Sequence, residues 1–443
     1  MPVDKWSALA LAVVSVATAQ SALAGQQEEA QGFVEDASLV LLNRNFYMNH
    51  DLRDSGPDEQ SYQEEWAQGF IGTFESGFTQ GTVGFGVDAY GMLGLKLDSG
   101  RGRSGTGLLP VDSEGRAQDD YSEAGGVVKM RLSSTVLKYG EMQVETPVFD
   151  TGDLRLLPET ATGFLLSSDE LEGLSLTAGH FTAFNNRDST NSRDEFFGYA
   201  VDTSAGGIDF VGGSYAISDA LSVTLYGSEL SETWRQYYGN LNYTLAIDDE
   251  QSLNFDFNLY RTNDHGEALA GEIDNTTFSL AAVYSIGAHS FALAYQKVDG
   301  DTPFDYVGGD SIYLANSVQY SDFNGAHEKS WQARYDLDMS SFGVPGLSFM
   351  ARYITGDNID GTRAEQGGAY NPFDEDLGEF VPLQGADGKH WERDLEVSYV
   401  VQEGAAKDLS FRVRQATHRA NADQGEGSID EVRLIIEYPL EIL

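Results

Sequence analysis

The last part of the chain places arginines at alternate positions between apolar residues. In LSFRVRQATHR (409–419), Arg412 and Arg414 stand beside Phe411 and Val413. Because successive side chains of a β-strand point to opposite faces, this stretch predicts a strand with one cationic and one apolar face. Two cations on one face lie about 7 Å apart along the strand, and such a cationic face attracts anions. The whole chain, in contrast, carries 27 Lys and Arg against 70 Asp and Glu, a formal net charge of −43.

The same alternation assigns further charged side chains to the polar face of a strand. Lys129 and Arg131 alternate with the apolar Val128 and Met130. Four more cations follow by the same argument: Lys138, Arg334, Arg352 and Arg433. Six acids also fall on polar faces: Glu75, Asp88, Asp256, Asp336, Glu396 and Glu437. Any single one of these residues is equally well interpreted as a solvated wall residue or as half of a local ion pair. The prediction of a functional set of charges therefore depends on all of these residues together.

Alternation of apolar and polar residues recurs along the chain and predicts the elements that position these cations. We expect eighteen strands, which begin near residues 36, 66, 82, 125, 134, 162, 171, 207, 221, 234, 252, 276, 290, 328, 346, 391, 409 and 430. Short turns at 79–81, 216–220 and 285–288 alternate with long loops at 98–124, 180–206, 299–327 and 356–390. An even number of strands, with short turns on one side and long loops on the other, is typical of bacterial outer-membrane barrels.

The predicted fold class is therefore all-β, an 18-stranded transmembrane antiparallel β-barrel. Unpaired backbone groups are costly in hydrocarbon, so the sheet must close, and the strand at 430–442 should pair with the strand near 36–49. The long loops should face outward, and both termini should lie in the periplasm. A soluble β-sandwich or β-helix is the alternative. No short repeat period supports a β-helix, and apolar faces on almost every strand exceed what one sandwich core requires.

Residues 1–24 have the pattern of a secretory signal peptide. Lys5 precedes a mostly apolar run, and a small-residue Ala-Leu-Ala site ends at Ala24. We expect cleavage after Ala24 during export to a Gram-negative outer membrane, which leaves 25–443 as a single barrel domain. The sequence contains no cysteine, so disulfides, a catalytic thiol and a cysteine metal site are excluded.

An eighteen-stranded barrel is wide enough for a water channel, so some segment must narrow it. The connection at 145–164 is the candidate, because its apolar pair Leu156-Leu157 suits packing against the inner wall and brings Arg155 near the constriction. Many of the acids lie in outer loops, as in the stretch 112–123. The net negative charge therefore describes the rim of the barrel, whereas the charges at the narrow part act at short range.

Six stretches spread over nearly the whole mature chain form a specific set. They are GVDAYGMLGLKLDSG (86–100), RLLPETATG (155–163), LTAGHFTAFNNR (176–187), SVQYSDFNG (317–325), ERDLEVSYVV (392–401) and KDLSFRVRQATHRANADQGEGSIDEVRLIIEYPL (407–440). In these stretches the chain resembles the OprD family of outer-membrane carboxylate channels of Gram-negative bacteria. The resemblance implies an eighteen-stranded porin for small carboxylates, with a line of wall arginines, the basic ladder, that guides the anionic group. On matching motifs this role is assigned to Arg155, Arg393, Arg412, Arg414 and Arg433, although strand alternation puts Arg393 on the opposite face.

The resemblance also implies a polar, acidic patch opposite the basic ladder. Ser317, Tyr320 and Asp322 have the S-x-x-Y-x-D spacing of that patch. A carboxylate on the ladder and an ammonium group on the patch would suit an amino acid, whereas the ladder alone suits a small organic or aromatic acid. The alternative for these three residues is an ordinary loop turn, which Ser and Asp favour.

Two other functions are compatible with a barrel. A general diffusion porin shares the fold but would lack a line of cations across separate strands. A barrel enzyme, such as an outer-membrane phospholipase or protease, needs a base within reach of a nucleophile. The seven histidines are scattered and none lies in a recognisable nucleophile motif: His50, His180, His265, His289, His327, His390 and His418.

We therefore expect a porin and not an enzyme, with no cofactor, no metal site and no nucleic-acid partner. The expected partners are small anionic or zwitterionic solutes inside the barrel, and outer-membrane lipid and lipopolysaccharide outside it. The expected state is a monomer or a weak oligomer.

Overall fold

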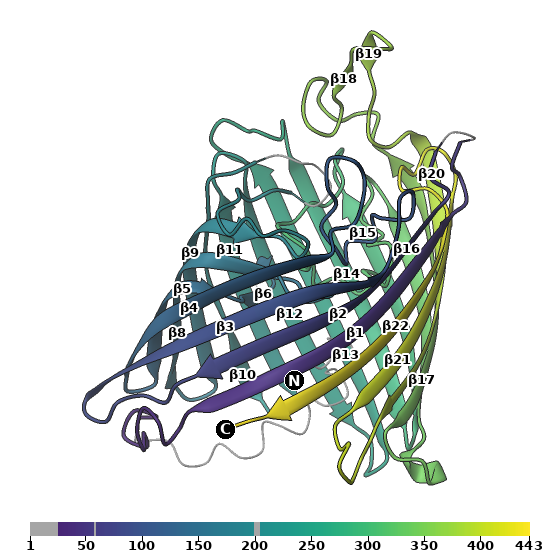
Figure 1. Cartoon of the computed structure of the whole chain (residues 1–443). Helices are drawn as coiled ribbons and strands as arrows, with labels where there is room; N and C mark the ends of the chain where they lie inside the picture. The colour runs from purple at the N-terminus through teal and green to yellow at the C-terminus, as the bar shows by residue number, and fades with distance from the viewer. Residues whose placement is uncertain (1–24, 57–58, 199–203) are drawn as a thin grey trace.

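The computed structural model describes residues 25–56, 59–198 and 204–443, so the predicted signal peptide lies outside the described residues. The described chain forms one closed antiparallel sheet of eighteen strands (Figure 1). The strands are β1 (Ser38–Leu52), β2 (Tyr62–Glu75), β3 (Val83–Asp98), β4 (Asp120–Leu132), β5 (Thr135–Met142), β8 (Thr160–Leu171), β9 (Leu174–Asn185), β10 (Ile208–Ser218), β11 (Leu221–Leu230), β12 (Trp234–Ala246), β13 (Gln251–Asp264), β14 (Asp274–Ile286), β15 (His289–Asp299), β16 (Lys329–Asp338), β17 (Leu347–Asp360), β20 (Ala386–Val400), β21 (Ser410–Ala420) and β22 (Ile429–Glu441).

The first and last strands close the sheet. β1 pairs with β2 on one side and with β22 on the other, where Val40 lies opposite Glu441. Each strand of the described barrel thus has a partner on both edges, which confirms the predicted barrel and its closure. The strands begin within five residues of the predicted positions. The largest offsets are at β4, which begins at Asp120 instead of near 125, and at β20, which begins at Ala386 instead of near 391.

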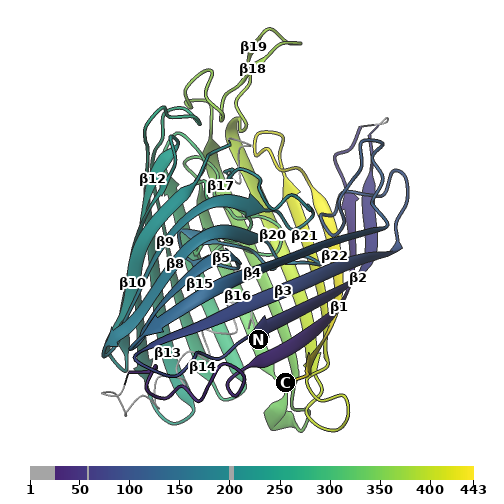
Figure 2. The ribbon, with the colours of Figure 1, turned by 60° about the vertical axis from the view of Figure 1, so that its left-hand side comes forward.

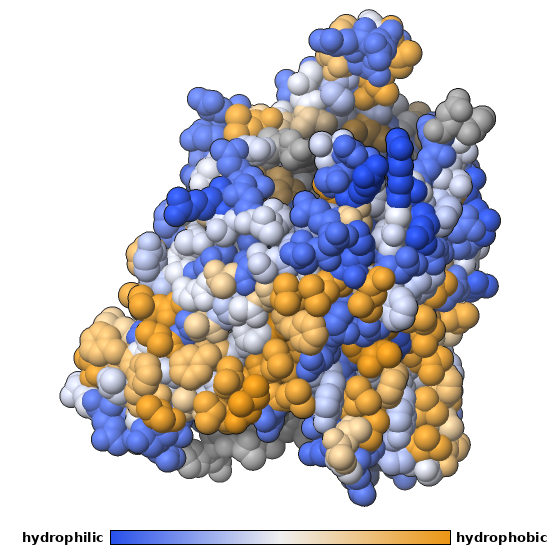
Figure 3. All heavy atoms as spheres, viewed as in Figure 1, coloured by the Kyte–Doolittle hydropathy of each residue, from blue (hydrophilic) through white to orange (hydrophobic). Residues whose placement is uncertain are grey.

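Alternation separates an apolar outer face from a polar inner face. On β3, Phe85 and Val87 are exposed on the outside, whereas Gly84 and Gly86 beside them are buried. Figure 3 shows the result for the whole wall, with apolar residues forming a band across the lower part of the barrel beneath a polar rim. Such a band of apolar side chains is what contact with hydrocarbon requires.

Long loops and short turns lie at opposite ends of the barrel (Figures 1 and 2). β1 begins and β22 ends at the short-turn end, where the 3-10 turn η1 (Ser340–Phe342) also joins β16 to β17. At the long-loop end, a small hairpin of β18 (Phe373–Asp374) and β19 (Glu379–Phe380) projects beyond the rim. The predicted alternation of short and long connections is therefore confirmed. Within the described residues, no helix is long and apolar enough to cross a membrane.

The connection between β5 and β8 folds into the barrel as predicted. It contains the small hairpin of β6 (Glu145–Thr146) and β7 (Phe149–Asp150). Leu156 and Leu157 are buried in an apolar cluster that includes the wall residues Phe46 and Met48. We call residues 143–159 the constriction loop. The predicted range, 145–164, is too long at its end, because Thr160 already begins β8.

A second connection also folds inward, which the pattern of strands and loops did not predict. Residues 300–328, here called the second inner loop, join β15 to β16 and were expected among the long loops facing outward. Instead Phe304, Tyr306 and Val307 are almost fully buried, and they share an apolar cluster with Phe149 of the constriction loop. The apolar residues of this loop follow neither a helical nor a strand period, so the sequence pattern does not predict their burial.

Candidate functional site

A cavity of about 650 Å³ lies inside the barrel between the two inner loops and the wall. Among the described residues, its lining contains six arginines: Arg155, Arg187, Arg334, Arg352, Arg414 and Arg433. It also contains six carboxylates: Glu145, Asp256, Asp310, Asp322, Glu396 and Glu431. The formal charges of these twelve groups cancel, so this narrow part does not share the strong negative charge of the whole chain.

Four of these arginines come from neighbouring strands of one arc of the wall. The strand register places Arg334 of β16 opposite Arg352 of β17, and Arg414 of β21 opposite Arg433 of β22. Arg352 lies opposite Asp394 of β20, which separates the two arginine pairs. We call these four residues the wall arginines. Strand alternation predicted that all four point inward, and they line the cavity.

Each wall arginine forms an ion pair with a carboxylate of the same strand or of a strand beside it. The shortest contacts between nitrogen and oxygen are 2.7 Å for Arg334–Asp336, 2.5 Å for Arg352–Asp394, 3.0 Å for Arg414–Glu396 and 2.6 Å for Arg433–Glu431. The wall arginines therefore line the cavity, as strand alternation predicts. They are also halves of local ion pairs, which was the alternative interpretation. The pairing weakens the field of the arginines but fixes the positions of their guanidinium groups.

The constriction loop is joined to the wall by Arg44, a cation that was not predicted from the sequence. Arg44 of β1 is buried and binds Asp153 through two hydrogen bonds, of 2.6 Å from Nη1 and 2.9 Å from Nη2. Nη1 also donates to the backbone oxygen of Arg155 at 2.9 Å, and Nε donates to Glu437 at 2.6 Å. On the neighbouring strand, a side chain at Gly69 would lie 3.1 Å from the backbone oxygen of Leu156. The loop is therefore held tightly against β1 and β2.

Arg155 and Arg187 supply the cations at the constriction. The Nε of Arg155 donates to the backbone oxygen of Thr106 at 3.2 Å. Arg187 follows β9, and its Nη1 lies 3.8 Å from Oε1 of the buried Glu159. Arg155 was predicted to lie here, whereas Arg187 was missed, since a loop residue after a strand has no alternation to indicate its direction.

Glu159 connects the constriction loop to the second inner loop. Its Oε2 accepts hydrogen bonds from the backbone N–H groups of Gly152 at 2.9 Å and Gly309 at 3.0 Å. Burial raises the pKa of the Glu159 carboxyl to about 7. The two loops therefore form one internal unit, which narrows the barrel from two sides.

The second inner loop brings Ser317, Tyr320 and Asp322 together on the cavity wall. Ser317 Oγ donates to Asp322 at 2.6 Å, and the Tyr306 hydroxyl donates to the other oxygen of Asp322 at 2.6 Å. The backbone N–H of Tyr320 donates to Glu392 of β20 at 2.9 Å. We call Ser317, Tyr320 and Asp322 the loop patch. Burial raises the pKa of the Asp322 carboxyl to about 6, although the bonds from Ser317 and Tyr306 oppose the shift.

The remaining inward cations lie away from the cavity, toward the short-turn end. Lys129 and Lys138 share Asp88, at 2.5 and 3.2 Å. Arg131 lies over the ring of Phe78, 4.1 Å from its centroid, and donates to Gln27 at 2.9 Å. Whether a solute contacts these three cations on its way through the barrel stays a prediction.

Arg412 lies two residues before Arg414 on the same face of β21. Its Nε is 3.8 Å from Glu396, which also pairs with Arg414. One carboxylate thus forms ion pairs with two arginines.

Arg393 does not line the cavity. It lies on the outward face of β20 with the exposed Leu395 and Val397, and its Nη2 donates to Gln415 and Thr417, each at 3.2 Å. The motif match placed this arginine on the basic ladder, and the structure corrects that assignment. The physical reason is the two-residue period of a strand, which fixes the direction of Arg393 whatever motif contains it.

The adjoining arc of the wall, on β12 and β13, carries an amide-rich network. Asp256 of β13 accepts hydrogen bonds from Asn240 and Asn242 at 2.8 and 2.9 Å, and from Asn258 at 2.5 Å. Alternation predicted that Asp256 points inward, but its role in this network depends on the register of β12 against β13. These groups offer hydrogen bonds to a polar solute from a second side of the cavity.

The comparison with family models identifies one family. The model described as outer membrane porin, OprD family, matches residues 31–442. A curated relative, Porin D of Pseudomonas aeruginosa, is 57% identical over the full length of both chains.

The chain is also similar to solved structures of porins. The crystal structure of Pseudomonas aeruginosa OprD is 56% identical, with a TM-score of 0.80 that covers 94% of this chain and 98% of the other. The crystal structure of Pseudomonas aeruginosa OpdK with vanillate is 37% identical, with a TM-score of 0.81 that covers 93% of this chain and 100% of the other.

Proposed function

The chain belongs to the OprD family of outer membrane porins, and on that premise we propose that its channel selects small solutes that carry a carboxylate. It is a channel of the Gram-negative outer membrane and not an enzyme. Selectivity then depends on the narrowest part of the lumen, where fixed charges act on a solute at short range.

One observation carries this proposal: wall arginines on four strands face a cavity that two inner loops have narrowed. A solute that crosses the cavity must pass guanidinium groups, which bind carboxylates with paired, directional hydrogen bonds. The relative OpdK has been crystallised with vanillate, an aromatic carboxylate. That ligand supports the same chemical class for this chain.

The loop patch favours a zwitterion over a simple anion. Asp322 and Asp310 of the second inner loop and Glu145 of the constriction loop face the same cavity as the wall arginines. A solute of amino-acid type places its carboxylate on the wall and its ammonium group near these acids. A general diffusion porin has no need of such separated charges.

The test is the flux of three solutes of similar size into proteoliposomes: alanine, propionate and alaninamide. At neutral pH these are a zwitterion, an anion and a cation. We expect alanine and propionate to enter faster than alaninamide, despite the acidic rim, and alanine to enter fastest. Similar fluxes for all three would establish a general diffusion porin instead.

A matched pair of variants separates the cavity from the rest of the barrel. Arg414→Gln should reduce the preference for propionate over alaninamide, because it removes a guanidinium group from the lining. Arg393→Gln should leave the preference unchanged, since Arg393 lies on the outward face. An equal effect of both variants would contradict the proposal.

Three further parts of the proposal concern the mature protein. We propose that the signal peptide is cleaved after Ala24, that residues 25–443 form one domain, and that lipid and lipopolysaccharide surround a monomer or weak oligomer. The N-terminal sequence of protein purified from outer membranes tests the cleavage. Light scattering in detergent tests the oligomeric state.

A further inference from the structure

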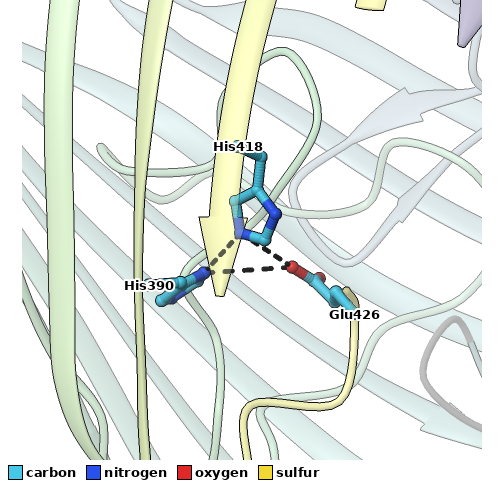
Figure 4. Close-up of side chains that lie close together, drawn as sticks. All are labelled: His390, His418 and Glu426. Carbon is cyan, nitrogen blue, oxygen red and sulfur yellow. Dashed lines mark hydrogen bonds and ion pairs between the residues drawn. The ribbon is translucent and has the colours of Figure 1, made fainter. Parts of the chain in front are cut away.

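Two histidines that lie far apart in the sequence come together in the folded chain (Figure 4). They lie near the long-loop end of the barrel, where β20 begins and β21 ends. His390 belongs to β20 and His418 to β21, and both side chains are fully buried. Nδ1 of His390 lies 2.8 Å from Nε2 of His418. Glu426, in the loop between β21 and β22, points its Oε2 at both nitrogens, at 4.0 Å from His390 and 3.7 Å from His418. One-third of the Glu426 side chain is exposed, so the group is open to solvent at this edge.

The second nitrogen of each ring has an acceptor of its own. Nε2 of His390 lies 2.7 Å from the buried carboxylate of Glu328, and Nδ1 of His418 lies 2.8 Å from the backbone oxygen of Gly427. Carboxylate and carbonyl oxygens accept hydrogen bonds, so each of these ring nitrogens carries a hydrogen. In the neutral rings, the lone pairs of Nδ1 of His390 and Nε2 of His418 must then point at each other. Two facing lone pairs repel unless a proton or a metal ion lies between them.

We infer that His390, His418 and Glu426 form a binding site for Zn²⁺. Two imidazoles and a carboxylate are a ligand set of zinc sites, with a fourth position left for water. Calcium and magnesium bind oxygen ligands and do not suit two ring nitrogens. In metal sites, a hydrogen bond from the second ring nitrogen fixes the orientation of each ligand histidine. Glu328 and the backbone oxygen of Gly427 accept these hydrogen bonds here.

The distances fit this ion after a small adjustment. Tetrahedral zinc with bonds of about 2.0–2.2 Å places its ligand atoms about 3.3–3.6 Å apart. The three separations here are 2.8, 3.7 and 4.0 Å, which bracket that value. Glu426 is also held in place, because Gln424 donates to its Oε2 at 2.9 Å. Each ligand therefore moves by about half an ångström or less to complete the site.

The zinc site lies directly behind the loop patch. The ring of Tyr320 is 5.0 Å from the ring of His418, and the Tyr320 hydroxyl donates to the backbone oxygen of Glu426 at 3.3 Å. The ring of Phe323 stacks on His390 at 4.1 Å. A bound ion would connect β20, β21 and the loop between β21 and β22, and would therefore brace the surface on which the patch rests.

The test is calorimetric titration of ZnCl₂ into the full barrel in detergent at pH 7.5. The protein is made without a histidine tag, stripped with chelator and kept in excess MgCl₂, because the many surface acids bind divalent ions weakly. We expect one saturable site per chain. Glu426→Gln and His418→Gln should each weaken binding by at least about tenfold, the effect typical of altered metal-site residues.

His180→Gln is the matched control, because His180 is exposed and pairs with Asp209 at 2.7 Å on another part of the barrel. It should leave the affinity unchanged. Heat-modifiable migration in gels shows that each variant is folded, and Glu426→Gln changes only a partly exposed loop side chain.

Co²⁺ supplies a second readout, since a tetrahedral cobalt site has strong visible absorption that an octahedral aquo ion lacks. We expect this absorption in the parent protein and its loss in Glu426→Gln. No saturable zinc binding in the parent, or binding that survives both Glu426→Gln and His418→Gln, would overturn the inference. A proton shared by the two rings would then be what joins them.

Discussion

The wall arginines and the loop patch face the same cavity, but different forces place them there. The register of hydrogen-bonded strands positions Arg334, Arg352, Arg414 and Arg433, and each has a carboxylate on its own strand or on the strand beside it. The loop patch depends on contacts between distant parts of the chain, such as that of Tyr320 with Glu392. The wall therefore provides a rigid, nearly neutral array of charges. The two inner loops set the width of the cavity and the positions of the loop acids Glu145, Asp310 and Asp322.

The largest effect is expected where wall and loop are joined. Arg44→Ala removes both hydrogen bonds to Asp153 and leaves that carboxylate and Glu437 without their shared cation. Breaking a buried ion pair from one side costs about 3–5 kcal/mol, so the constriction loop should detach from β1. Single-channel conductance in planar bilayers should rise, and the urea midpoint should fall. Unchanged conductance in a folded variant would mean that packing of Leu156 and Leu157 holds the loop without Arg44.

The next effect concerns ion selectivity. Arg412→Ala and Arg414→Ala should each shift the reversal potential toward cation selectivity, and the double variant should shift it further, since Glu396 then loses both partners. Coulomb attraction at 4 Å is about 1 kcal/mol in bulk water and about 4 kcal/mol at an effective dielectric constant of 20. Each arginine therefore changes the local occupancy of anions several-fold.

Glu396→Gln is the matched control for this prediction. It removes the carboxylate between the same two arginines, so the reversal potential should move in the opposite direction. The differences should shrink from 0.1 M to 1 M salt, as the screening length falls from about 10 Å to about 3 Å. Shifts of equal sign for Arg414→Ala and Glu396→Gln would contradict the assignment of these residues to the conduction path.

A smaller, substrate-specific effect should distinguish the loop patch from the wall. Asp322→Asn should reduce alanine flux and leave propionate flux nearly unchanged, because only alanine has an ammonium group to place on the patch. Since the pKa of Asp322 is raised to about 6, the wild-type carboxyl becomes neutral as the pH falls below that value. The ratio of alanine to propionate flux should therefore fall between pH 7.5 and 6 in the wild type, a range in which propionate stays ionised. In Asp322→Asn the ratio should stay flat over the same range. Equal loss of both fluxes would favour an ordinary loop turn.

The same contrast between wall and loop explains what the sequence could predict. Alternation gives the strand positions, the closure of the barrel and the direction of each wall cation to which it was applied. These include Arg393, whose outward direction the family motif would have reversed. Alternation gives nothing for Arg187, Glu159 or the second inner loop, whose positions depend on contacts between segments with no common period. The contact between His390 and His418 could not be predicted either. Twenty-eight residues separate them in the sequence, and only the pairing of β20 with β21 brings them together.

The smallest effect on transport, with a measurable effect on stability, is expected at the contact between the two inner loops. Burial raises the pKa of Glu159 to about 7 in the folded barrel, against about 4.3 in an unfolded chain. Between these values the folded state binds more protons than the unfolded state, so this group lowers the stability as the pH rises from about 4 to above 7. A shift of this size corresponds to a loss of about 4 kcal/mol.

Glu159→Gln removes the titration and keeps an oxygen to accept the N–H groups of Gly152 and Gly309. Its urea midpoint relative to the wild type should therefore rise from pH 5 to pH 8, while conductance stays nearly constant. Glu170→Gln is the control, because Glu170 is an exposed acid in the strand hairpin of β8 and β9. If the relative midpoint of Glu159→Gln does not change with pH, the buried carboxyl does not titrate in this range, and the link between the loops depends on hydrogen bonds alone.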